Sequence, residues 1–150
     1  MAIQIGDKLP SFKATKQDGT AFDSQEVNHK PVVIYFYPKD FTPGCTTQAC
    51  SFRDAYQDFK DLGAEVIGVS GDSASSHQNF QQKYKLPFIL LSDADRKLRR
   101  LFGVPTALFG LLPGRVTYVF DAKGYCIYIF DSMSAKNHIE RALKAIQKAK

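Results

Sequence analysis

One cysteine occupies a position that favours thiolate chemistry. Residues 37–45, with the sequence YPKDFTPGC, follow an apolar run and precede a helical pattern, so Cys45 lies at the start of a predicted helix. Thr42 is a good N-cap and Pro43 suits the first helical position, which makes Cys45 the third helical residue. Free backbone N–H groups and the positive end of the helix dipole stabilise a thiolate there. A thiolate attacks electrophilic oxygen or sulfur.

Two further side chains could complete a site around this sulfur. Thr42 can place its hydroxyl beside Cys45, although the same oxygen is expected to cap the helix, so the two roles would compete. Arg115 begins a predicted strand, and a strand end can direct its side chain into the same pocket. Its guanidinium stays charged and offers several donors in a fixed geometry, which suits charge on a leaving oxygen. Asp40 is expected to be a solvated loop residue.

The other two cysteines admit a structural interpretation. Cys50 lies one residue from the apolar face of the predicted helix, and helix cysteines are commonly buried and inert. Cys126 lies in an alternating strand and is expected to be structural. An odd number of cysteines, with no secretory signal, argues against a disulfide scaffold and indicates a reducing compartment.

The sequence carries no signal for a metal or an organic cofactor. Its histidines, His29, His77 and His138, are far apart and lack the spacing of a zinc site. Gly68 and Gly71 do not form a phosphate-binding pattern, and no flavin, haem or nicotinamide motif occurs. Catalysis is therefore expected to use cysteine alone.

Charge and hydropathy argue against nucleic-acid and membrane partners. The net charge is +5, and the densest basic run is expected to be a solvated helix face; it consists of Arg96, Lys97, Arg99 and Arg100. Aromatic residues do not interleave with these charges, so nucleic acid is not an expected partner. No apolar run approaches the roughly 18 residues that span a bilayer, so no membrane partner is expected either.

Strands and helices alternate along the chain. Apolar, β-rich runs predict strands at residues 32–37, 65–70, 88–91, 116–120 and 125–130. Helices are predicted to begin after the N-caps Thr42, Ser73, Asp93 or Asp95, and Ser134. Residues 103–115 are predicted to form a loop, and residues 6–20 short strands or a hairpin. This order indicates one domain over residues 1–150. The fold class is α/β, thioredoxin-like, with three layers, a mixed central sheet, helices on both faces and an N-terminal β-hairpin extension.

The segment around Cys45 carries a resemblance to a known family. Pro38-x-x-x-Thr42-x-x-Cys45 is similar to the signature of the peroxiredoxins. The segment from Thr42 to Cys45, followed by a second cysteine at Cys50, resembles the subgroup called peroxiredoxin Q or bacterioferritin comigratory protein. The similarity continues through most of the chain, in the segments at residues 52–54, 65–70, 86–88, 91–93, 103–105 and 112–115. Many members of this family have Glu where this chain has Gln48.

The resemblance implies a reaction cycle and a role for each residue. Cys45 would reduce hydrogen peroxide or alkyl hydroperoxides and become a sulfenic acid, in a pocket shaped by Pro38, Thr42 and Arg115. Cys50 would then resolve the sulfenic acid as an intramolecular disulfide. A thioredoxin-like protein would reopen this disulfide by exchange. No cofactor is implied.

Helix geometry places a constraint on that disulfide. Five residues along an intact helix separate the Cα atoms of Cys45 and Cys50 by about 8–9 Å. A disulfide requires Cα atoms roughly 4.4–6.8 Å apart. Residues near 45–52 are therefore predicted to unwind on oxidation.

Alternatives remain open at the level of the sequence. Cys126 is an alternative resolving thiol. A protein thiol–disulfide oxidoreductase is a second function, although that chemistry usually uses Cys-x-x-Cys, whereas Cys45 and Cys50 are separated by four residues. A peroxide sensor that passes oxidation to a partner is a third possible function. The resemblance suggests a monomer. The expected compartment is a bacterial cytoplasm, with the chloroplast as the alternative for a mature imported form.

Overall fold

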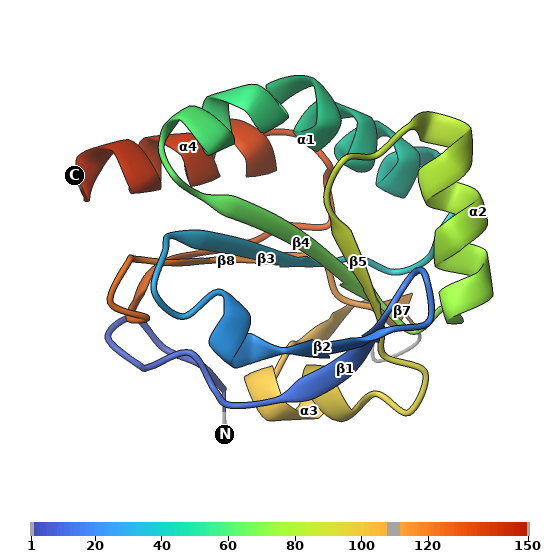
Figure 1. The fold of residues 1–150 in the computed structure, drawn as a ribbon, viewed down its shortest axis with the longest axis horizontal. Coiled ribbons are helices and arrows are strands. Elements are labelled where there is room, and N and C mark those ends of the chain that lie inside the picture. Colours follow the sequence, from blue (N-terminus) through green and yellow to red (C-terminus); the bar gives the residue numbers. More distant parts are fainter. Residues whose placement is uncertain (1, 108–111, 150) are drawn as a thin grey trace.

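A mixed sheet of seven strands runs through the centre of the protein (Figure 1). The computed structural model describes residues 2–107 and 112–149. The strand order is β2-β1-β5-β4-β3-β8-β9, in which β3, β4 and β5 are parallel and the other neighbours are antiparallel. The strands are β1 (Lys13–Lys16), β2 (Ala21–Asp23), β3 (Val32–Phe36), β4 (Glu65–Ser70), β5 (Ile89–Ser92), β8 (Val116–Phe120) and β9 (Cys126–Asp131).

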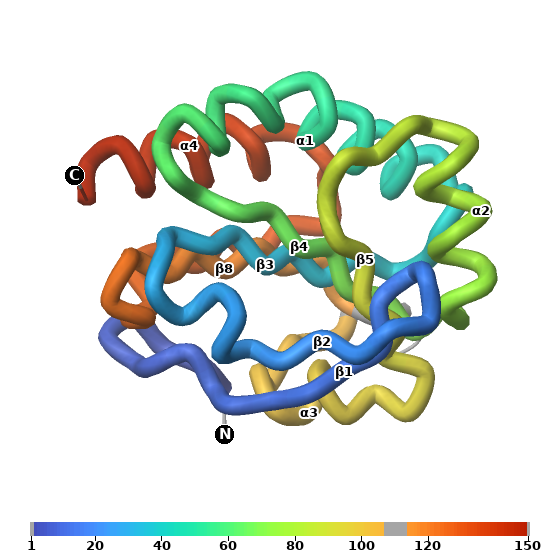
Figure 2. The backbone as a smooth tube through the Cα atoms, in the orientation of Figure 1, coloured from blue at the N-terminus to red at the C-terminus, as the bar shows by residue number. Residues whose placement is uncertain are grey.

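Helices cover both faces of this sheet. Helices α1, α2 and α4 lie on one face, with α1 and α4 side by side, and α3 lies on the other (Figures 1 and 2). Their bounds are α1 (Pro43–Asp61), α2 (Ala74–Tyr84), α3 (Lys97–Phe102) and α4 (His138–Lys148), with a short 3-10 turn at Ser24–Glu26. The hairpin of β1 and β2 extends the sheet beyond β5. The predicted three-layer α/β architecture with an N-terminal hairpin is therefore confirmed.

The central strand β3 is buried on both of its faces, as its unbroken apolar sequence predicts. On the α1 side, the ring of Tyr35 stacks on Phe52 with centroids 4.5 Å apart. On the α3 side, the ring of Phe36 lies 5.1 Å from that of Phe102. A shift of one residue would exchange these two sets of contacts, so the register of β3 is strongly fixed.

The pairing of β3 with β8 brings two distant segments to one edge of the sheet. Phe36, the last residue of β3, pairs with Val116, the first residue of β8, and the strands are antiparallel. The chain that leaves β3 and the chain that enters β8 therefore meet at the same edge. The first leads to Cys45, and the second contains Arg115.

The loop at residues 103–115 and the start of the last helix differ from their predictions. Residues 103–115 are more than a loop, because β6 (Thr106–Ala107) pairs with β7 (Leu112–Pro113) as a two-stranded sheet. Ser134 does not cap the last helix: its hydroxyl accepts the N–H of Lys136 in a separate turn, and α4 begins after Asn137, which has a φ of 71°. None of the helices in the described ranges is both long and apolar enough to cross a bilayer.

Candidate active site

The N-terminus of α1 has the predicted construction. Thr42 is the N-cap with an extended backbone, Pro43 is the first helical residue and Cys45 is the third. The first bond of the helix runs from the N–H of Thr46 to the carbonyl of Thr42, at 2.8 Å. The N–H groups of Gly44 and Cys45 precede this bond, so they remain outside the helical ladder. Cys45 is 1% exposed, and its sulfur lies where the helix dipole favours negative charge.

The predicted capping role of the Thr42 hydroxyl is wrong. It donates to the carbonyl of Lys39 at 2.8 Å, and α1 has no side-chain cap. The intervening turn contains Phe41 with a φ of 66°, which brings Thr42 within reach of Lys39. Pro38, two residues beyond the end of β3, is half-buried where this loop begins. The expected competition between capping and the pocket therefore does not arise, since the helix start is left open.

Arg115 lies against the sulfur, as its position at a strand end suggested. Its Nη2 is 3.3 Å from Sγ of Cys45, and the side chain is only 4% exposed. Two further bonds hold the guanidinium in place: Nε donates to the carbonyl of Met133 at 2.9 Å, and Nη1 donates to Oε1 of Gln48. A buried cation at this distance stabilises a thiolate and any negative charge that develops beside it.

Gln48 is a neutral hydrogen-bond partner of Arg115. Its side chain is fully buried, and its Nε2 has no hydrogen-bond partner in the part of the chain that is described. Because the amide is neutral, Gln48 orients Arg115 without forming an ion pair with it. A carboxylate at this position would compete with the sulfur of Cys45 for the positive charge. The departure from Glu at this position therefore leaves more of that charge available to the sulfur.

The remaining cysteines have different surroundings. Cys50 lies in the same unbroken helix as Cys45 and is half-buried. Cys126 is buried in the core layer on the α3 side of the sheet, whereas Cys45 belongs to the layer on the α1 side. Burial raises the pKa of the Cys126 thiol to about 11. The sheet thus separates Cys126 from Cys45, which argues against it as the resolving thiol.

Two residues that the sequence assigned to solvent are buried near the site. Arg99 is 9% exposed, and its guanidinium donates to the carbonyls of Tyr37 at 2.9 Å and Gly114 at 3.2 Å. These carbonyls directly precede Pro38 and Arg115, so Arg99 ties together the two segments that carry the site. Burial lowers the pKa of Arg99 below its ordinary value. The only sequence signal was its place next to an apolar helix face, which is weak.

Asp40 is the second of these residues. It was predicted to be a solvated loop residue, but it is 3% exposed and bonded to the side chains of Tyr37 and His77. Tyr37 lies 3 residues before it, but His77 lies 37 residues further along the chain, so the local sequence alone did not indicate the burial of Asp40.

Comparison with known proteins identifies the family. The model of the AhpC/TSA family matches residues 5–129. The chain belongs to the AhpC/TSA family. It is 53% identical over 146 residues to the chloroplastic peroxiredoxin Q of Oryza sativa subsp. japonica, covering 97% of this chain and 67% of the relative. It is 50% identical over 149 residues to the chloroplastic peroxiredoxin Q of Sedum lineare, covering 99% and 80%.

Solved structures agree with this assignment. Peroxidoxin BcpB of Mycobacterium tuberculosis superposes with a TM-score of 0.90 at 32% identity, covering 99% of each chain. A mutant of PrxQ from Xylella fastidiosa gives a TM-score of 0.91 at 26% identity, covering 99% of this chain and 98% of that one. The thioredoxin-like fold and the predicted enzyme class are thereby confirmed: the protein is a thiol-dependent peroxidase.

The surroundings of Cys126 predict its reactivity. Near about pH 8, iodoacetamide should leave Cys126 unmodified, because a thiol with a pKa of about 11 is protonated there and only the thiolate reacts. Labelling should increase as the pH is raised toward about 11. Peptide mass spectrometry would measure both, with Cys50 as the internal control and circular dichroism as the check on folding. Complete labelling of Cys126 at the lower pH in folded protein would contradict this.

The buried bonds of Arg99 predict that it contributes more to stability than its exposed neighbour Arg100. Arg99→Met should lower the free energy of unfolding by about 1–3 kcal/mol, because two buried carbonyls lose their donor. Arg100→Met, at an exposed position of the same helix, should change it by less than about 0.5 kcal/mol. Urea unfolding of the two variants measures the difference. Equal stabilities would show that the Arg99 bonds are not needed.

Proposed function

We propose that Cys45 is the peroxidatic cysteine of this thiol peroxidase and that Cys50 resolves its sulfenic acid. The observation that carries the proposal is the 3.3 Å contact between Nη2 of Arg115 and Sγ of Cys45 at the open N-terminus of α1. Hydrogen peroxide and alkyl hydroperoxides are the proposed substrates. Alkyl peroxide reduction is named for the bacterioferritin comigratory protein of Xanthomonas campestris, which is 30% identical with a TM-score of 0.86.

In the first step, the Cys45 thiolate attacks the terminal oxygen of the hydroperoxide. The O–O bond breaks, the sulfur becomes a sulfenic acid and the alkoxide takes a proton to leave as the alcohol. Arg115 and the N–H groups at the start of α1 stabilise the thiolate before the attack and the negative charge that passes to the leaving oxygen. Pro38 and Thr42 form the loop side of the pocket.

In the second step, the Cys50 thiol condenses with the sulfenic acid and water leaves. Helix α1 is continuous from Pro43 to Asp61 with both cysteines free, so this step requires its first turns to open. Cys50 itself is half-buried, so its side chain can leave its place with little loss of packing, whereas Ala49 and Phe52 of the same turns belong to the core.

A thioredoxin-like dithiol is the proposed reductant, and it would reopen the disulfide by exchange. We further propose that the protein acts as a monomer. The proposed setting is a bacterial cytoplasm. A chloroplast is the alternative, which the chloroplastic relatives support.

Peroxide consumption with a thioredoxin and thioredoxin reductase system tests the assigned roles. Wild type should turn over repeatedly and Cys45→Ser should consume none, because the nucleophile is absent. Cys50→Ser should consume one equivalent and then stop, because its sulfenic acid is not resolved. Cys126→Ser is the control and should behave as wild type. Normal turnover by Cys50→Ser would assign resolution to another thiol, and inactivity of wild type would refute the peroxidase cycle with this reductant.

Hydrogen exchange tests the predicted unwinding. In the reduced protein, amides of residues 45–52 beyond the first turn should exchange slowly, as in a formed helix. After one equivalent of peroxide, their exchange should become much faster. Cys50→Ser treated in the same way is the control, since it cannot form the disulfide. Protection that is unchanged in disulfide-bonded wild type would show that the helix does not open.

A further inference from the structure

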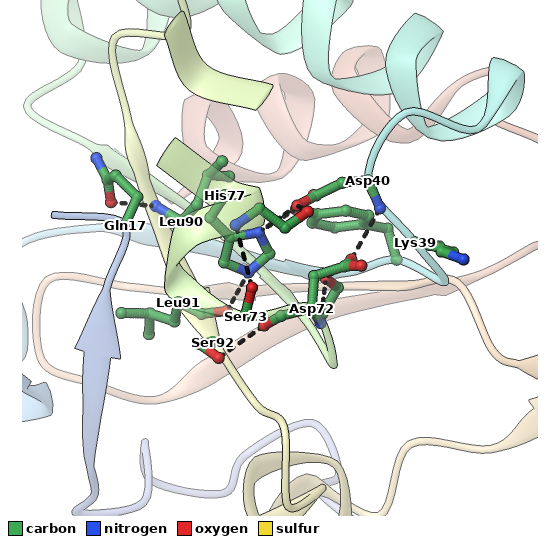
Figure 3. Close-up of polar contacts among 12 residues, drawn as sticks. Gln17, Lys39, Asp40, Asp72, Ser73, His77, Leu90, Leu91 and Ser92 are labelled. Atoms are coloured by element: carbon green, nitrogen blue, oxygen red, sulfur yellow. Dashed lines mark hydrogen bonds and ion pairs between the residues drawn. The ribbon is translucent and has the colours of Figure 1, made fainter. Parts of the chain in front are cut away.

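A buried cluster of hydrogen bonds lies against the loop that precedes α1. Figure 3 shows His77 of α2 between Asp40 of this loop and the backbone of Leu91 in β5, with Asp72 beside them. His77 is fully buried, and Asp40 is nearly so. Three parts of the chain therefore meet at one point: the loop after β3, the continuous segment that leads from the end of β4 into α2, and β5.

Both ring nitrogens of His77 and both carboxyl oxygens of Asp40 have hydrogen-bond partners. Nε2 of His77 is 2.9 Å from the carbonyl oxygen of Leu91, which can only accept, so Nε2 carries a proton. Nδ1 of His77 is 2.7 Å from Oδ2 of Asp40, so a second proton lies between these two atoms. Asp40 also accepts from the hydroxyls of Tyr37 at 2.6 Å and Ser76 at 2.9 Å, as a carboxylate does. His77 is thus bonded through both ring nitrogens, and the Asp40 carboxyl group accepts or shares hydrogen bonds with three side chains.

Asp72 holds the backbone of the same loop. The N–H of Asp40 donates to Oδ2 of Asp72 at 2.8 Å, so Asp40 is bonded through its side chain and its backbone. The next residue, Phe41, has a φ of 66°, a conformation that is unfavourable by about 1–2 kcal/mol for a residue with a side chain. The ring of Phe41 packs on Phe80 of α2, with centroids 5.0 Å apart. Helix α2 therefore stabilises a strained turn that ends at Thr42, the N-cap of α1.

A metal centre is the alternative interpretation of this cluster. Asp40, Asp72 and His77 bring possible ligand atoms within 4.8 Å of one another. Each of them, however, already has hydrogen-bond partners inside the protein, and Nδ1 of His77 is engaged with Asp40. A cation would have to displace a proton and several of these bonds, so the cluster is better suited to holding the loop.

We propose that Asp40 and His77 are positioning residues for the reaction of Cys45 with peroxide. They fix the turn before α1, so that the Thr42 side of the pocket and the N–H groups of the helix start face the sulfur. The inference rests on the proposed function of Cys45. Because the anchor lies on the N-terminal side of Thr42, it remains in place when residues 45–52 unwind. The pair should therefore support the attack on peroxide and contribute little to disulfide formation by Cys50.

The experiment separates these two steps. His77→Leu removes both bonds of the imidazole, whereas His77→Asn keeps an amide donor toward Asp40, and Asp40→Asn removes the charge of the carboxylate. Competition with a second peroxidase gives the rate constant for Cys45 oxidation, and quenched alkylation with mass spectrometry gives the rate of disulfide formation. Hydrogen exchange of residues 40–45 follows the loop without any need for activity.

Two controls accompany these variants. Asn79→Ala changes an exposed residue of α2 and should leave both rates unchanged. Phe22→Leu truncates a buried side chain of β2 in the core layer on the opposite side of the sheet, which lowers stability without contact with the loop. It shows what a general loss of stability does to the same two rates.

The expected result is a selective loss. His77→Leu and Asp40→Asn should oxidise about ten- to a hundredfold more slowly at Cys45, as small misplacements of reacting groups do, with disulfide formation unchanged. His77→Asn should be intermediate, and exchange of residues 40–45 should follow the same order. If His77→Leu does not fold, the other two variants decide by the same comparison.

Three results would overturn the proposal. The first is a rate of Cys45 oxidation in the folded variants that equals that of wild type. The second is an equal slowing of Cys45 oxidation and disulfide formation. The third is the same loss of oxidation rate in Phe22→Leu at matched stability. Inactivity of wild type would refute the proposed function instead. In that case, unchanged exchange of residues 40–45 in the variants would also refute the anchor.

Discussion

A guanidinium and a sulfur that are both withdrawn from water lie 3.3 Å apart, and much of the protein is arranged to keep them there. A buried charge is tolerated only when its donors are satisfied and an opposite charge is near. Arg115 meets this requirement with the carbonyl of Met133, the amide of Gln48 and the sulfur of Cys45. Cys45 and Gln48 lie on α1, Arg115 directly precedes β8 and Met133 follows β9, so the contact exists only when these parts of the fold are packed together.

The sheet first brings the segments that carry Arg115 and Cys45 together. The antiparallel register of β3 and β8 places the chain before Arg115 beside the chain that leads to Cys45. Arg99 then holds these segments in place, because its bonds to the carbonyls of Tyr37 and Gly114 fix the two chains beyond the last ladder bonds. The cation that faces the sulfur is thus held by a second buried cation, which contacts neither the sulfur nor any carboxylate at salt-bridge distance in the described residues.

Local signals in the sequence were sufficient for the helix start and for most strands. The start of α1 after Thr42 and the apolar run of β3 depend on neighbouring residues, which the sequence displays directly. Arg115 could be proposed from its residue type, but its distance from Cys45 depends on a strand register that no single segment encodes. Arg99 could not be recognised, because its partners are backbone carbonyls, which every residue has. Ser134 misled for a related reason: a hydroxyl can close a turn as well as cap a helix.

The continuity of α1 from Pro43 to Asp61 has a thermodynamic consequence for the proposed cycle. If the disulfide excludes the intact helix, reduction returns the first turns of α1 to their packed state, and the free energy of that refolding adds to the driving force for accepting electrons. For a two-electron couple, each 1.4 kcal/mol regained in this way raises the reduction potential by about 30 mV. In the proposed cycle, oxidation by peroxide unfolds the first turns of α1 and reduction lets them refold. The free energy of this refolding then favours regeneration of the reduced enzyme.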